Sequence, residues 1–228
     1  MRKMKYKIQY VYVQEEEPQT LDNAKALGID LGVDNLVTCV PSDGTPFIID
    51  GRKLKSYNRY WNKKKAYYQS IADHQKINGV TKRIALLNFK RNNKVKDCIR
   101  KSARCIVNYC ISNDIGTIVV GYNEDFKRNA NLGQRNNQNF VQLPLGDLRQ
   151  SLQYLCERYN IQYTEQPYTG TFSGKRVYRG LYKSSDGTLL NADVNGAANI
   201  LRKAKVNGCD ISLPSSGCLA HPLRIKLA

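Results

Sequence analysis

The sequence of 228 residues lacks long apolar segments and closely spaced metal-binding side chains. No apolar run approaches the roughly 18 residues that a membrane helix needs, so we expect no membrane partner. Its start alternates polar and apolar residues and lacks the continuous apolar core of a secretory signal, which argues against export. There are two histidines, seven scattered cysteines and no CxxC. We therefore expect reduced thiols, a cytoplasmic location and no structural zinc.

Acidic residues are scarce in one segment of a strongly basic chain. The whole chain carries 36 Lys+Arg against 19 Asp+Glu, a net charge of +17. Between Arg52 and Arg104 there are 17 basic residues and only two acidic ones, Asp73 and Asp97. This concentration favours a nucleic-acid backbone as partner over the alternative, a solvated helix face. The candidate contacts are Lys63, Lys64, Lys82, Arg83, Lys90, Arg91, Lys94, Arg100, Lys101 and Arg104.

Hydrophobic periodicity predicts a mixed α/β fold. Strands are expected at 7–13, at 27–40 (two strands separated by a turn), at 47–50, at 117–121 and at 161–166. Helices are expected at 57–75, 81–112, 140–159 (starting near Pro144) and 192–205, with a loop at 167–190. The order predicts three antiparallel strands followed by parallel strands with helical crossovers. Ribonuclease H-like nucleases have a sheet of this order.

The same pattern predicts the domain organisation. We expect a strand and linker at 1–20, one α/β domain at 21–206 that includes a basic helical segment at 52–112, and an irregular tail at 207–228.

Two aspartates are candidate cation ligands. Asp30 lies within the apolar strand, between Gly28 and Gly32, where an unpaired carboxylate is costly unless it binds a cation. The alternative for Asp30 is a turn or capping role. Asp193 opens a helix of small residues that could pack closely on the sheet and bring Asp193 near Asp30. An ordinary N-cap role is an equal alternative for Asp193.

Four segments resemble TnpB, the transposon-encoded OrfB family related to type V CRISPR effectors. Gly28–Gly32 resembles its first RuvC motif and Asn191–Ile200 its third, and Gly133–Pro144 and Lys175–Tyr182 are also similar. The resemblance extends over about 5–228. It implies a RuvC-like fold in a prokaryotic RNA-guided DNA endonuclease, with guide RNA and target DNA as partners. It also implies two Mg²⁺ or Mn²⁺ ions held by an Asp–Glu–Asp set, whose aspartates correspond to Asp30 and Asp193.

The sequence departs from this family in three ways. Whole TnpB proteins are longer, and only the strand at 7–13 could remain from their N-terminal wedge region, which leaves room for a partner protein or domain. The zinc ribbon between the second and third RuvC motifs is absent. Gly121 stands where the usual catalytic glutamate ends its strand.

A relocated glutamate could supply the third carboxylate. Glu165, at the end of a later strand, is our expected catalytic and metal-binding residue beside Asp30 and Asp193, and Glu124 is the alternative. A third possibility is that neither glutamate binds metal. The predicted function is a TnpB-like DNA endonuclease core with two divalent metals. The alternative is a nuclease-dead RNA-guided DNA-binding protein of the same fold.

Overall fold

The computed structural model describes residues 8–13, 17–122, 142–167, 174–178, 180–204 and 219–227. Their centre is a six-stranded mixed sheet with the strand order β5-β4-β1-β2-β3-β9. Its strands are β1 (Asp22–Leu31), β2 (Asn35–Pro41), β3 (Phe47–Asp50), β4 (Ile115–Tyr122), β5 (Gln162–Pro167) and β9 (Leu223–Ile225). The first three form an antiparallel meander, and β4 and β5 add in parallel beside β1. The expected mixed sheet is confirmed.

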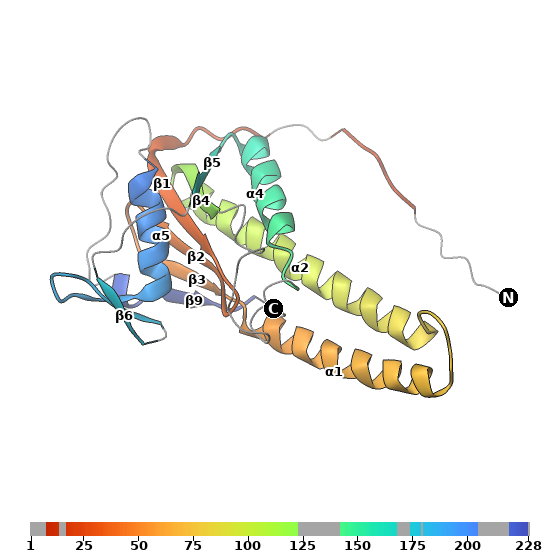
Figure 1. Ribbon diagram of the computed structural model, residues 1–228. Helices are drawn as coiled ribbons and strands as arrows, with labels where there is room; N and C mark the ends of the chain where they lie inside the picture. The colour runs from red at the N-terminus through yellow and green to blue at the C-terminus, as the bar shows by residue number, and fades with distance from the viewer. Residues whose placement is uncertain are drawn as a thin grey trace.

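Helices cover both faces of this sheet (Figure 1). They are α1 (Arg52–His74), α2 (Lys82–Ser112), α4 (Leu145–Tyr159) and α5 (Ala192–Lys203). Helix α5 lies on one face, whereas α2 and α4 pack together over the other, where most of the buried side chains lie. Helices α1 and α2 form a hairpin whose far half extends beyond the sheet (Figure 1).

The sequence of α2 explains why this long helix forms. Thr81 is its N-cap and accepts a hydrogen bond from the backbone N–H of Ile84 at 3.3 Å. Helix α2 carries an apolar stripe, centred on Val95, Ile99 and Ile106, that is buried against the sheet. Cys98, Cys105 and Tyr109 are half-buried at the margin of this stripe. Burial of these apolar side chains stabilises the packing of α2 on the sheet.

Three segments differ from expectation. Residues 8–13 form no strand, and their apolar side chains are exposed because no described element covers them. The expected loop at 167–190 includes a small antiparallel sheet of β6 (Lys175–Tyr178), β7 (Leu181–Lys183) and β8 (Leu189–Asn191). The tail that we expected to be irregular contributes β9, which pairs in parallel with β3. Across the described parts of the chain, no helix is long and apolar enough to cross a membrane.

Candidate metal site and nucleic-acid surface

Close packing of α5 on β1 places Asp193 near Asp30. A Cβ atom at Gly28 would lie 2.6 Å from the carbonyl oxygen of Ala197 and 2.8 Å from Cβ of Leu201, so the helix rests directly on the strand. Asp193 precedes Ala197 by one turn, and Asp30 follows Gly28 by two residues. One turn of α5 and two residues of β1 each cover about 6 Å. The carboxylates of Asp193 and Asp30 therefore lie close together, one step past the contact at Gly28.

The electrostatics of Asp30 show that the negative charge of the pair is only partly compensated. Burial and, to a smaller extent, the nearby carboxylate of Asp193 together raise the pKa of Asp30 to about 7. The backbone N–H of Leu31 and the guanidinium of Arg176 act in the opposite direction but do not cancel the effect. Two close carboxylates that resist joint ionisation are typical of a site that a cation completes.

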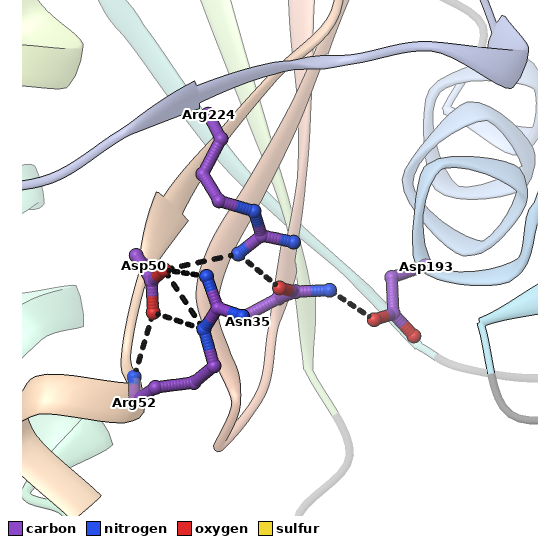
Figure 2. Close-up of polar contacts among 5 residues, drawn as sticks. All are labelled: Asn35, Asp50, Arg52, Asp193 and Arg224. Atoms are coloured by element: carbon purple, nitrogen blue, oxygen red, sulfur yellow. Dashed lines mark hydrogen bonds and ion pairs between the residues drawn. The ribbon is translucent and has the colours of Figure 1, made fainter.

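Asp193 is held by a chain of polar contacts that Figure 2 shows. Asn35, at the start of β2, donates from Nδ2 to Oδ2 of Asp193 at 2.6 Å. Arg224 on β9 donates to Oδ1 of Asn35 at 2.9 Å and lies 3.4 Å from Asp50. Asp50 is also bound by Arg52, which lowers the pKa of that carboxyl group to about 2. The meander and β9 thus fix the orientation of Asp193.

The capping alternative for Asp193 is resolved by its neighbour. Asn191 is the N-cap of α5, and its Oδ1 accepts hydrogen bonds from the backbone N–H groups of Asp193 and Val194 at 3.1 and 3.2 Å. The side chain of Asp193 therefore remains available for the site, where Arg176 of β6 lies 3.5 Å away. Sequence reasoning missed Asn35, because the asparagine of an Asp-Asn turn is expected to serve only the turn itself.

The structure does not bring Glu165 to this pair. In the parallel β4–β5 register Glu165 lies beside Val120, which packs in the core on the α2 and α4 side. Neighbouring strand residues share a face and successive ones alternate, so Glu165 points away from α5 and Asp193. The residues on the Asp30 side are Gly121 and Gln166. The other candidate, Glu124, lies outside the described residues.

Glu165 instead joins α4 to β5. Arg149 donates to both carboxylate oxygens of Glu165 at 2.8 and 2.7 Å, and the hydroxyl of Tyr163 donates at 2.8 Å. The guanidinium of Arg149 also lies 3.4 Å from the ring centroid of Tyr122. A bidentate pair stacked on a ring is a well-ordered structural contact.

Replacing Glu165 tests this structural role. We expect Glu165→Gln to lower the free energy of unfolding by about 1–3 kcal/mol, because Arg149 loses its partner in a partly desolvated place. Binding of Mn²⁺ should not change. Urea unfolding and a Mn²⁺ titration measure the two effects, and Glu157→Gln, at an exposed position of α4, is the matched control. If Glu165→Gln abolishes Mn²⁺ binding and leaves the free energy of unfolding unchanged, Glu165 is a metal ligand and not a structural residue.

Asp30 and Asp193 are two of the three carboxylates that the expected two-metal site would need. In the described part of the chain, no group of three or more His, Cys, Asp or Glu side chains is placed to hold a metal ion. Asp30 and Asp193 provide hard oxygen donors and a charge that balances one divalent ion. A second ion would need a further carboxylate, and the neighbouring strand positions on that face, Gly121 and Gln166, have none.

The basic candidates lie on the α1–α2 hairpin, but they are not equivalent. Arg91 is half-buried and donates to Asn58 at 2.9 Å and to the carbonyl of Gln142 at 2.6 Å, so it holds the hairpin together. Arg104 donates to the hydroxyl of Tyr159 at 2.7 Å, and Lys101 pairs with Asp97. The side chains of the other seven are exposed: Lys63, Lys64, Lys82, Arg83, Lys90, Lys94 and Arg100.

A basic groove continues this surface between α2 and α4. Its lining includes five cationic side chains, which are Lys96, Arg100, Lys101, Arg104 and Arg158, and a single carboxylate, Asp147. Such a groove suits a phosphate backbone, because each neutralised phosphate releases condensed counterions.

Comparisons with known proteins identify the family of this chain. Residues 9–127 match the OrfB_IS605 family, described as a probable transposase. The chain is 28% identical over 195 residues to the TnpB-like protein ORF457 of Acidianus two-tailed virus, covering 79% of this chain and 42% of that protein.

The fold is shared with solved CRISPR effector structures. A Cas12f1–sgRNA–target DNA complex matches with a TM-score of 0.59 and 21% identity, over 78% of this chain and 50% of that one. A CRISPR-Cas12f ternary complex matches with a TM-score of 0.64 and 18% identity, over 84% and 41%. The chain thus spans half or less of the length of these relatives. With more than half of its residues matched, the chain belongs to the OrfB_IS605 (TnpB) family of probable transposases.

Proposed function

We propose that this chain is the RuvC-like core of an RNA-guided DNA endonuclease, in which Asp30 and Asp193 hold a divalent cation. The observation that carries the proposal is the pairing of these carboxylates beneath α5, with a raised pKa on Asp30. The basic hairpin and groove would hold a guide RNA–DNA heteroduplex by its backbone. Guide RNA and target DNA are the partners named for one of the structures that share the fold.

Mg²⁺ or Mn²⁺ bound by these residues would supply a polarised phosphate and an activated water for phosphodiester hydrolysis. The protein contributes the positions of the donors. Asn35 holds one oxygen of Asp193, so the other can face the cation. Arg176, 3.5 Å from Asp193 and largely exposed, is placed to contact a phosphate that enters the site.

A nuclease-dead RNA-guided DNA-binding protein is the second candidate function. The observation that favours it is the absence of a third carboxylate beside Asp30, since Gly121 and Gln166 occupy the described positions there. Such a protein would keep the basic surface and bind its target without cutting it.

The experiment uses RNA that co-purifies with the chain when it is expressed together with the DNA flanking its gene. Labelled DNA that matches this RNA is incubated with the complex and Mg²⁺. We expect cleavage by the unaltered chain, and bound but uncut DNA with Asp193→Ala. Bound DNA that the unaltered chain never cuts would establish the second candidate. Failure to retain RNA would contradict both.

The basic surface should give a steep salt dependence of nucleic-acid binding. Replacing Lys82, Lys90 and Arg100 by Gln should flatten the slope of log K against log salt by about two to three units, since each phosphate contact on duplex DNA contributes about 0.9. Fluorescence anisotropy at several salt concentrations measures this slope.

The matched control removes three exposed charges outside the hairpin, from Arg202, Lys203 and Lys226. Its slope should stay close to that of the unaltered chain. Equal flattening by the two triple variants would show that net charge alone, rather than the hairpin, governs binding.

A further inference from the structure

Helix α1 carries a stripe of tyrosines that neither the metal site nor phosphate binding explains. Tyr57, Tyr60, Tyr67 and Tyr68 (the tyrosine stripe) lie at spacings of three, seven and one, which place them along one side of the helix. Tyr60 and Tyr67 are 53% and 59% exposed. They are two helical turns apart, which separates them by about 10 Å along the helix. Aromatic residues on a helix usually pack into a core, but these two rings face solvent.

Cations surround the tyrosine stripe. The ammonium nitrogen of Lys64 lies 6.0 Å from the ring centroid of Tyr60, and that of Lys94 lies 4.7 Å from that of Tyr57. The guanidinium of Arg83, on the neighbouring helix, lies 5.7 Å from the ring centroid of Tyr68. Three of the four rings are therefore near a positive charge that could hold a phosphate while the ring stacks on a base, and the fourth, Tyr67, contacts the ring of Tyr68 at 5.5 Å between centroids.

This combination fits unpaired bases better than the other possible partners. Single-stranded nucleic acids bind to basic surfaces on which aromatic rings stack against successive bases. A duplex offers no free base face, because its bases are already stacked and paired. A second copy of this chain would place two strongly basic hairpins against each other, and like charges across an interface are unfavourable.

We propose that the tyrosine stripe is a stacking platform for unpaired bases of the guide RNA, with Tyr60 and Tyr67 as the two rings that bases contact. This inference rests on the proposed function, because in an RNA-guided protein the guide supplies unpaired nucleotides before any target is bound. Base stacking on these rings would add a contact that does not depend on salt to the phosphate contacts of the basic side chains.

The test compares three labelled probes of about 16 nucleotides: single-stranded RNA, single-stranded DNA of the same sequence, and an RNA duplex. We expect Tyr60→Leu with Tyr67→Leu to weaken binding of single-stranded RNA about tenfold or more, with an unchanged salt slope. Duplex binding should not change. Leu is a good helix former, so the hairpin should stay folded, which circular dichroism checks.

Two controls sharpen the result. Tyr60→Phe with Tyr67→Phe keeps both rings and should bind RNA as the unaltered chain does. Tyr178→Leu removes a ring that is 65% exposed on β6, outside the tyrosine stripe, and should have no effect.

Four outcomes would overturn the inference: unchanged RNA affinity, an equal loss on the duplex, a loss on DNA without one on RNA, or a dimer in sedimentation that only the Leu variant dissociates. If the Leu variant binds normally while the Lys82, Lys90 and Arg100 variant loses its salt slope, the inference fails and the proposed function stands. If no probe binds the unaltered chain, the proposed function fails first.

Discussion

Replacing Gly121 by Glu should strengthen divalent cation binding about tenfold or more and speed DNA cleavage. Gly121 lies beside Asp30 on the α5 side of the sheet, so its side chain would add the missing third carboxylate. A new Cβ would come 2.3 Å from Cδ1 and 3.0 Å from Cγ1 of the buried Ile200, so that side chain must shift to admit the glutamate. Affinity for hard cations rises with the number of carboxylate donors. Mn²⁺ titration by electron paramagnetic resonance measures the gain.

Gly121→Gln is the matched control, because it has the same shape without the charge. Gln166→Glu offers an independent route, since Gln166 on β5 lies next to Gly121 on the same face. If Gly121→Gln binds Mn²⁺ as tightly as Gly121→Glu, or if neither added glutamate increases affinity, the third carboxylate does not belong at this edge.

Replacing Asp30 by Asn should stabilise the metal-free protein at pH 8. The folded pKa of Asp30 is about 7 and its unfolded value is near 4, so the folded state holds the proton more tightly in that window. Stability therefore falls as pH rises from about 4 to 7, by an amount on the order of 3–4 kcal/mol. Asn cannot ionise and escapes this loss. Urea unfolding with a chelator at pH 5 and pH 8 measures the difference.

Magnesium should reverse the order of stability. Mg²⁺ should stabilise the unaltered chain at pH 8, because it binds only the folded carboxylate pair, and should not stabilise Asp30→Asn. Asp43→Asn, on an exposed turn, is the control and should show the pH dependence and the Mg²⁺ response of the unaltered chain. If the stability of Asp30→Asn depends on pH as strongly as that of the unaltered chain, the raised pKa of Asp30 is not the cause of the pH dependence.

The sequence predicted the sheet and the aspartate pair because their signals are local. Asp30 lies in an apolar strand. The helix that follows Asp193 contains small residues, Gly196, Ala197 and Ala198, which predict close packing on the sheet. The observed contact of α5 with Gly28 follows from these two patterns. Strand β9 was not predicted, because three residues in a polar tail have no periodicity and gain their order only from pairing with β3.

The position of Glu165 shows what a linear sequence cannot predict. Its place at the end of a strand suggested the site, but the β4–β5 register decides on which face of the sheet its side chain lies. A shift of one residue would have turned it toward Asp30. The ion pair with Arg149 was equally hidden, since α4 and β5 meet only through the tertiary fold.

The most direct test of the account is a count of Mn²⁺ ions bound by the full chain and by two variants. We predict one tightly bound ion in the unaltered chain, loss of that ion in Asp30→Asn, and its retention in Glu165→Gln. An ion retained by Asp30→Asn, or lost from Glu165→Gln, would contradict the assignment of the Asp30–Asp193 pair as the metal site.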